Sequence, residues 1–204
     1  MYIQATNKMD YHGTMDPLNI PVYPNEIISL NKYKKYFEDV LVFDIGAFKG
    51  IWSLTALKSG AKYVIAFELE PIEDLCVNLS EYAGKYRCIN AFVTDEEHLQ
   101  KDDNFRITID NFVAKQCNLK HNEVMQLGFI KIDVEGDEME VLRGAEKTIK
   151  RLKPRMMIES HDYKFPGRKE EIQMRLDSWG FGAPRDITDH TVGLSEIYHI
   201  FYMN

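Results

Sequence analysis

The sequence predicts an α/β domain with a mostly parallel sheet and helices on both faces. From Val40 onward, apolar runs of strand length alternate with helical patterns. That alternation is typical of parallel strands joined by crossover helices. Near the end of the chain, an aromatic-rich run, Ile197–Tyr202, follows a segment interrupted by Gly182, Pro184 and Gly193. This last part predicts a hairpin that completes the sheet.

The individual elements follow from the positions of these runs. We expect strands at 40–45, 63–68, 87–93, 106–109, 129–134, 155–160 and within the final hairpin. We expect helices at 26–38, from the turn after residue 45 to about 58, and at 72–82, 137–152 and 169–179. The helix at 137–152 has acidic residues at its start and basic residues at its end, as the helix dipole favours.

Two segments divide the chain. Residues 1–39 are expected to form an N-terminal arm or lid and a helix packed on the domain, because Pro17, Pro21 and Pro24 interrupt a polar stretch. Residues 40–204 are expected to form the catalytic domain. The arm is too short to fold alone, so a single domain is the simplest organisation.

Composition excludes some partners and locations. The net charge is −7, with 32 acidic and 25 basic residues, so attraction to nucleic acid or to an anionic membrane is not expected. Three cysteines, Cys76, Cys88 and Cys117, show no metal-ligand spacing and suggest reduced thiols. No run approaches the roughly 20 apolar residues that cross a membrane. We therefore expect a cytoplasmic protein.

The stretch Val42–Gly50 carries the strongest functional signal. It reads as a buried strand that ends near Asp44 and turns through Gly46 and Gly50 into a helix. Glycine lets the backbone approach a ligand closely, and the first N–H groups of the helix are free to bind it. A dinucleotide fingerprint would place glycine where Phe48 stands, and an acid at the strand end would repel a pyrophosphate.

A second acid, Glu68, closes the next apolar run. A carboxylate there can accept hydrogen bonds from both hydroxyls of a ribose. S-adenosylmethionine has a ribose, an ammonium and a sulfonium but no phosphate. Together, Asp44 and Glu68 favour this cofactor.

Four blocks of sequence resemble the FkbM-type S-adenosylmethionine-dependent methyltransferases. They are VFDIGAFKGIWSL (42–54), VIAFELEP (64–71), FIKIDVEGDEMEVLRGA (129–145) and MMIESH (156–161). The third block is the most specific to that family. Phe48 and Leu69 depart from it, standing where Asn and Pro are common, and the segment 86–110 is short. The resemblance implies a Rossmann-like class I methyltransferase with a mostly parallel seven-stranded sheet and a C-terminal antiparallel hairpin.

Cofactor contacts are expected along the first turn and at the ends of the following strands. Ser53 is placed to bond the methionine carboxylate, whereas Thr94 and Asp95 fit either an adenine contact or a plain helix start equally well. The full set of expected cofactor-binding residues is Asp44, Gly46, Ala47, Phe48, Lys49, Gly50, Ser53, Glu68, Leu69, Thr94, Asp95 and Asp133.

Catalytic candidates lie where the later strands end, because ligands of open α/β sheets bind beyond the carboxyl ends of the strands. A hydroxyl acceptor must lose a proton, and His161 is the first candidate for the base. Asp133 and Glu135 are second choices, with Glu159 as an orienting partner. A purely structural His161 is the alternative.

The acidic run 133–138 raises the question of a metal. Its spacing does not match an EF-hand loop, and acids at a helix start need no ion to explain them. A divalent cation is compatible with the sequence but not favoured, and no metal ligand is assigned.

The resemblance implies O-methylation of sugars or secondary metabolites. We expect a methyl acceptor that is a saccharide or a similar small polyhydroxyl compound. Three alternatives stay open: methylation of an RNA end, methylation of nitrogen, and a cofactor-binding module that works with a partner or a fused glycan-processing domain. The oligomeric state is left open.

Overall fold

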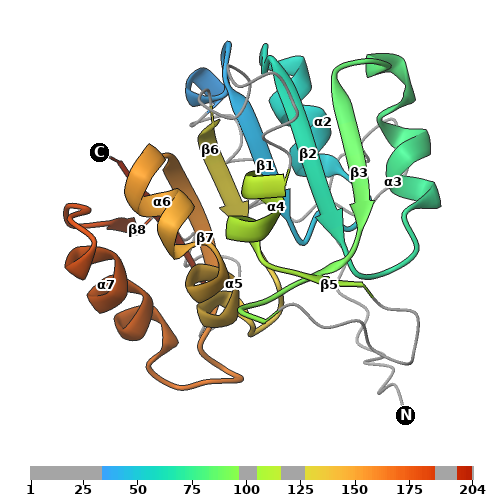
Figure 1. Cartoon of the computed structure of the whole chain (residues 1–204). Helices are drawn as coiled ribbons and strands as arrows, with labels where there is room; N and C mark the ends of the chain where they lie inside the picture. Colours follow the sequence, from blue (N-terminus) through green and yellow to red (C-terminus); the bar gives the residue numbers. More distant parts are fainter. Residues whose placement is uncertain (1–33, 97–104, 116–126, 187–196, 204) are drawn as a thin grey trace, which may run out of the picture.

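The computed structural model describes residues 34–96, 105–115, 127–186 and 197–203. At its centre is a seven-stranded sheet in the order β3-β2-β1-β6-β7-β9-β8 (Figure 1). Its strands are β1 (Leu41–Ile45), β2 (Tyr63–Glu68), β3 (Tyr86–Asn90), β6 (Leu127–Ile132), β7 (Arg155–His161), β8 (Arg185–Asp186) and β9 (Ile197–Tyr202). The helices are α2 (Ile51–Lys58), α3 (Glu73–Asn78), α4 (Ile109–Lys115), α5 (Glu138–Gly144), α6 (Glu146–Leu152) and α7 (Arg168–Ser178), with 3₁₀ turns η1 (Lys34–Tyr36) and η2 (Ser80–Tyr82).

The order of the strands confirms the predicted fold class. Strand β1 pairs in parallel with both β2 and β6, so the winding reverses between β1 and β6. Strand β9 is antiparallel to β7 on one side and to β8 on the other. The sheet is therefore mostly parallel and ends in an antiparallel hairpin.

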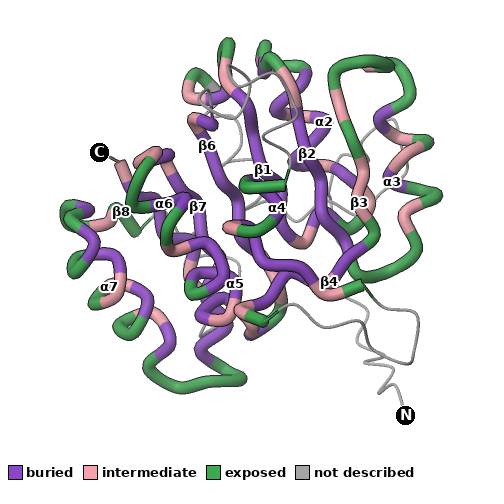
Figure 2. Tube along the Cα trace, in the orientation of Figure 1, coloured by how far each residue is buried: buried purple, intermediate pink, exposed green. Residues whose placement is uncertain are grey.

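Alternating side chains of the central strands fill two cores. On β1, Phe43 and Ile45 belong to the core shared with α4, α5, α6 and α7, whereas Val42 belongs to the core shared with α2 and α3. Figure 2 shows the central strands buried along almost their whole length. Burial on both faces explains why these strands read as continuous apolar runs and not as alternating ones.

Two expected elements are divided in the structure. The strand expected at 87–93 breaks at Ala91, whose N–H bonds to the Glu68 carbonyl, and its end becomes β4 (Phe92–Val93). β4 pairs with β5 (Arg106–Ile107) in a separate two-stranded sheet. The strand expected at 106–109 is therefore not part of the main sheet, and β8 is the seventh strand instead.

The helix expected at 137–152 is also divided. It forms α5 and α6, which meet at Ala145, where φ is −113° and ψ is 3°. Asp110 of α4 accepts hydrogen bonds from the N–H groups of Lys147 and Thr148 in the first turn of α6. The break lets α4 cap a second helix, and it directly follows Gly144, a residue type common at helix ends.

Most of the expected N-terminal arm and helix lies outside the described residues, which begin in this region with η1. Cys76 and Cys88 are free thiols, and Cys117 also lies outside. Among the described helices, none has the length and hydropathy to cross a bilayer.

Candidate active site

The turn after β1 is formed by close packing against the segment after β6. Gly46 has a φ of 77°, and a Cβ placed on it would lie 1.7 Å from the carbonyl oxygen of Asp133. The N–H groups of Gly46 and Ala47 both donate to the Phe67 carbonyl at 3.0 Å. Only glycine fits at position 46, because both the backbone angle and the space exclude a side chain.

A buried lysine connects the two strands that flank the switch point. Lys131 on β6 is opposite Asp44 on β1, and its Nζ lies 3.3 Å from Asp44 Oδ1 and 3.2 Å from Asp133 Oδ2. Ser53 of α2 donates to Asp44 Oδ2 at 2.7 Å. Lys131 is only 4% exposed, so it supplies the counter-charge for both carboxylates. Lys131 was not predicted from the sequence, although a lysine inside the apolar run FIKI is a visible signal.

Glu68 holds the loops around the turn. Its carboxylate accepts the N–H groups of Phe48 and Glu70. Each carboxylate oxygen has two lone pairs, so these bonds leave acceptor capacity for a ligand. The Asn90 side-chain amide, which the sequence analysis also missed, donates to the carbonyls of Glu68, Leu69 and Glu70 at 2.9–3.0 Å. The loop after β2 is therefore fixed from both sides.

The other predicted residues around the turn after β1 either shape the backbone or are exposed at the surface. Gly50 has a φ of 86° and is the N-cap of α2, and the Lys49 carbonyl accepts a bond from Asn78 at 2.9 Å. Phe48 and Leu69 are exposed, at 59% and 39%. Two large apolar side chains beside the turn can cover a bound ligand.

Thr94 and Asp95 are tied to α5. Arg143 lies 2.7 Å from an Asp95 carboxylate oxygen, and this hydrogen bond is the main cause that holds the pKa of Asp95 below its usual range. Thr94 is buried, and its carbonyl oxygen would lie 2.0 Å from a Cβ on Gly144. In this structure, Asp95 therefore fastens β4 to a helix.

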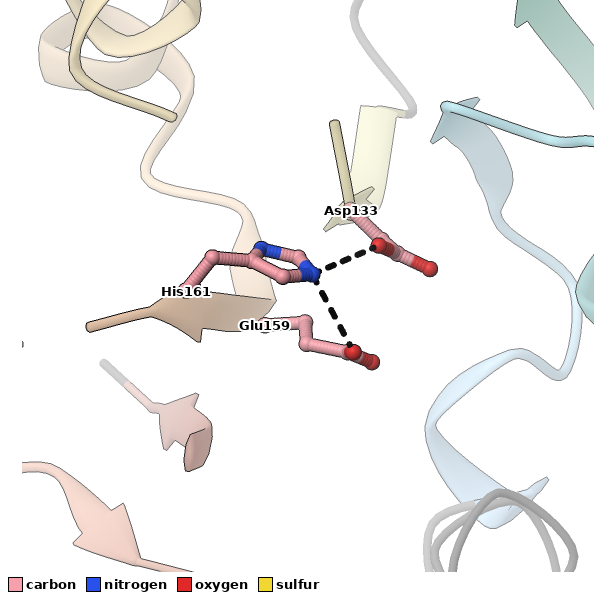
Figure 3. Close-up of side chains that lie close together, drawn as sticks. All are labelled: Asp133, Glu159 and His161. Atoms are coloured by element: carbon pink, nitrogen blue, oxygen red, sulfur yellow. Dashed lines mark ion pairs between the residues drawn. The ribbon is translucent and has the colours of Figure 1, made fainter. Parts of the chain in front are cut away.

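His161, at the end of β7, lies among four carboxylates. Its Nδ1 is 2.7 Å from Glu138 Oε1, and its Nε2 is 3.4 Å from Glu159, 3.7 Å from Glu135 and 3.8 Å from Asp133. The ring is 1% exposed, and Figure 3 shows Nε2 directed at Asp133 and Glu159. The structure thus brings the four expected catalytic side chains together. The sequence analysis missed Glu138, which it took as part of a helix start.

The protonation states in this cluster follow from its charges. Burial alone would lower the pKa of His161, but the hydrogen bond to Glu138 and the nearby carboxylates of Glu159 and Asp133 raise it to about 10. Burial, reinforced by the charge of Glu159, raises the pKa of Asp133 to about 6 against the opposing effect of Lys131. Without a further ligand, His161 is therefore an imidazolium at neutral pH and cannot accept a proton.

Glu159 and Glu135 remain ionised. Burial would raise the pKa of Glu159, but His161 and His199 outweigh it and hold this pKa far below its usual range. His199 on β9 lies 2.7 Å from Glu159 Oε2 and was not anticipated. Burial likewise opposes ionisation of Glu135, yet its bond to Lys164 lowers the pKa. Both carboxylates are thus available as anionic ligands.

Comparison with protein families decides the relationship of this chain. Residues 44–182, more than half of the sequence, match the methyltransferase FkbM domain. The chain belongs to the FkbM methyltransferase family. This match confirms the resemblance seen in the sequence blocks, and it covers the Gly46 turn, Glu68 and the His161 cluster.

Solved structures of methyltransferases share the fold of this chain. A methyltransferase FkbM from Methylobacillus flagellatus KT superposes with a TM-score of 0.63 at 20% identity, covering 80% of this chain and 43% of that one. This chain thus spans less than half of that protein. An rRNA methylase from Streptococcus thermophilus has a TM-score of 0.57 at 14% identity, covering 91% and 99%. Trm5b from Pyrococcus abyssi has a TM-score of 0.55 at 15% identity, covering 90% and 49%. At these identities the likeness shows the class I methyltransferase fold alone.

Within the FkbM domain, the predicted residues form two connected groups. Asp44, Ser53 and Asp133 are joined through Lys131, and Asp133 also faces His161. Their assigned roles in binding and catalysis remain predictions.

Proposed function

We propose that this FkbM protein is an S-adenosylmethionine-dependent O-methyltransferase that acts on a hydroxyl of a saccharide or similar small polyhydroxyl acceptor. One observation carries the proposal: Asp133 belongs to both groups of the site. Its Oδ2 lies 3.2 Å from Lys131, next to Asp44, and its Oδ1 faces His161 at 3.8 Å. A cofactor at the Gly46 turn and an acceptor at His161 would therefore meet at Asp133.

The residues around the turn fit S-adenosylmethionine. Gly46 lets the turn pack directly against the backbone of Asp133, and carboxylates at positions 44, 68 and 133 suit a ligand with an ammonium and ribose hydroxyls. They would repel the phosphates of a dinucleotide. Glu68 would hold the ribose, and Ser53 with the start of α2 would hold the amino-acid end. When bound, this cofactor supplies a methyl group activated by a positive sulfonium.

The protein then has to hold the acceptor in line, exclude water and remove a proton. In the arrangement described, His161 is a proton donor, so we propose that Asp133 takes the proton of the acceptor hydroxyl. His161 would orient Asp133 and Glu159 around the acceptor. Asp133, a second choice from the sequence, thus replaces His161 as the proposed base.

Charge supports a small neutral acceptor over RNA. The chain has a net charge of −7, and the cluster around His161 adds carboxylates to the acceptor side. A phosphate backbone approaching them would be repelled. The similarity to RNA methyltransferases is in the fold alone.

Calorimetry with S-adenosylhomocysteine tests the cofactor. We expect one site per chain, and Glu68→Gln should weaken it at least about 10-fold, because hydrogen bonds to charged groups contribute about 1.5–3 kcal/mol. The exposed Glu81→Gln is the matched control and should bind as the wild type does. Absence of binding to the wild type would refute the proposal.

Transfer of a radiolabelled methyl group to a panel of sugars, nucleosides, amines and RNA tests the acceptor. We expect labelled ethers of polyhydroxyl compounds. Labelling of RNA or amines alone would establish one of the alternative functions. Cofactor binding with no transfer to any acceptor would instead indicate a binding module that serves a partner.

His161→Ala tests the cluster separately. Turnover should fall about 100-fold or more, which is typical of losing a proton-transfer group or its positioning. Affinity for S-adenosylhomocysteine should change little, since His161 touches none of the Gly46 turn. Unchanged turnover would remove His161 from the mechanism.

A further inference from the structure

We propose that His161, Asp133 and Glu159 bind a divalent transition-metal cation at the acceptor side of the site. The three donor atoms are His161 Nε2, Asp133 Oδ1 and Glu159 Oε1. They come from the ends of the neighbouring strands β6 and β7, and one ligand atom from each of the three residues lies within 4.8 Å of the others. Figure 3 shows the Nε2 side of the imidazole facing both carboxylates.

The strongest evidence is that His161 Nε2 lacks a hydrogen bond. This nitrogen is buried and has no hydrogen-bond partner among the described residues, although carboxylate oxygens lie 3.4–3.8 Å away. A buried polar atom without a partner costs free energy. A cation between the nitrogen and the oxygens would satisfy all of them at once.

The far atom of each proposed ligand is already held by another side chain. Glu138 lies 2.7 Å from His161 Nδ1, His199 lies 2.7 Å from Glu159 Oε2, and Lys131 lies 3.2 Å from Asp133 Oδ2. Metal-binding histidines typically donate their other N–H to a carboxylate, which fixes the ring and its tautomer. All three ligands thus turn their remaining atom toward one point.

The separations suit coordination after a small adjustment. Ligands about 2.1 Å from a tetrahedral cation lie roughly 3.4 Å apart. His161 Nε2 is 3.4 Å from Glu159 Oε1 and 3.8 Å from Asp133 Oδ1. The Asp133 and Glu159 side chains are 20% and 18% exposed, so a fourth ligand can enter from solvent.

The donor set selects the class of cation. One imidazole with two carboxylates suits Mn²⁺, Fe²⁺ or Zn²⁺, whereas Mg²⁺ prefers an all-oxygen shell. From the sequence, a divalent cation was compatible but not favoured, because the acidic run 133–138 was considered without His161 and Glu159. Only Asp133 of that run is a ligand in the proposed site.

The role of the cation rests on the proposed function. An acceptor hydroxyl in the open position would be acidified, as a metal lowers the pKa of bound water from 15.7 to about 7. Its proton would pass to Glu135, whose Oε1 lies 3.7 Å from His161 Nε2, and then to solvent. Asp133 would become a ligand and no longer serve as the base.

Binding of Mn²⁺ to protein stripped with EDTA tests the site without any need for activity. We expect one Mn²⁺ per chain by calorimetry and electron paramagnetic resonance, with nitrogen modulation from a bound imidazole. Glu159→Gln and His161→Gln should each weaken binding at least about 100-fold, more than the loss of an outer partner. Glu146→Gln, which changes an exposed carboxylate paired with Lys150, is the control and should bind normally.

Glu138→Gln tests the orienting partner. It keeps all three ligands but loses the charge that fixes His161, so Mn²⁺ affinity should fall about 10–100-fold while the nitrogen signal persists at saturation. Circular dichroism of each variant shows that it is folded. If a variant does not fold, the nitrogen signal of the wild type still decides the question.

Two results would overturn the cation site. One is that stripped wild-type protein binds neither Mn²⁺ nor Zn²⁺ with a dissociation constant below about 1 mM, which is on the order of the weakest functional sites. The other is binding without an imidazole signal. Titration with S-adenosylhomocysteine separates the two proposals: cofactor binding without Mn²⁺ binding refutes only the cation site, and Mn²⁺ binding without cofactor binding refutes only the proposed function.

Discussion

Lys131 is a single cation enclosed between two carboxylates of the sheet. Replacing it by methionine keeps the volume but removes the buried ammonium beside Asp44 and Asp133, so that among the described residues Asp133 keeps only His161 as a positive neighbour. Removing one partner of a buried ion pair costs about 3–5 kcal/mol, so we expect the free energy of unfolding to fall by about that amount in urea titrations. S-adenosylhomocysteine binding should weaken as well, since Asp44 would lose its anchor.

Lys150→Met is the matched control for that experiment. Lys150 pairs with Glu146 at 2.8 Å, but both side chains are partly exposed, and such pairs contribute about 0–1 kcal/mol. Equal losses for the two lysines would show that Lys131 does not act as a buried counter-charge.

Alanine variants of Gly46 and Gly84 distinguish the cost of backbone strain from the cost of a steric clash. Both have positive φ, 77° and 84°, so alanine at either position pays about 1–2 kcal/mol for the left-handed conformation. Only at Gly46 does the new Cβ also meet backbone, at 1.7 Å from Asp133 O, whereas nothing lies within 4 Å at Gly84. Gly46→Ala should therefore lower the unfolding temperature far more and abolish cofactor binding. Similar melting curves for both variants would mean that the turn has room to shift.

At the scale of elements, Asp110 on α4 caps the first turn of α6. Its two oxygens accept the N–H groups of Lys147 and Thr148 at 3.0 and 2.7 Å. Asp110→Ala should cost about 1–2 kcal/mol of unfolding free energy, as for the loss of a helix cap, measured by chemical denaturation. Asp110→Asn keeps one acceptor oxygen and should lose less. No difference between the two variants would argue against the capping role.

The elements that the sequence predicted well are those with strong local signals. The buried strands β1, β2, β6 and β7 are mainly apolar runs. The observed ends of each strand lie within two residues of the expected ends. The breaks at Ala91 and Ala145 were not predicted, although Gly144, which disfavours a continuous helix, directly precedes the second. Each break goes with a partner far along the chain: β5, which pairs with β4 after Ala91, and Asp110, which caps the start of α6.

At the scale of the whole molecule, the parallel sheet explains why the site could be located from the sequence. The ends of parallel strands meet at one edge, so Asp44, Glu68, Asp133 and His161 could be grouped without a structure. Their partners could not. Lys131 stands out as a lysine in an apolar run, but its partners, like those of Glu138 and His199, are set by contacts between elements, and those contacts determine charge and orientation in the site.

Stability as a function of pH tests the charge balance of the cation-free protein. The His161 ring faces Glu138 through Nδ1 and Asp133, Glu135 and Glu159 through Nε2. Its pKa is raised from 6.5 to about 10, so the folded state holds this proton more tightly than the unfolded state. The stabilisation is fully present below about pH 6.5 and is lost as the pH rises through about 10. The unfolding temperature of EDTA-treated protein should therefore fall between pH 7 and 9.5.

His161→Gln isolates this contribution from other groups that titrate at high pH, such as Cys88, whose pKa burial raises to about 12. Glutamine carries no titrating proton, so the variant should be less stable than the wild type at pH 7, with the difference shrinking toward pH 9.5. Differential scanning calorimetry of both proteins over this range measures it. If the unfolding temperatures of the two proteins differed by the same amount at every pH, His161 would already be neutral at pH 7. The four carboxylates around it would then lack the positive charge of the imidazolium.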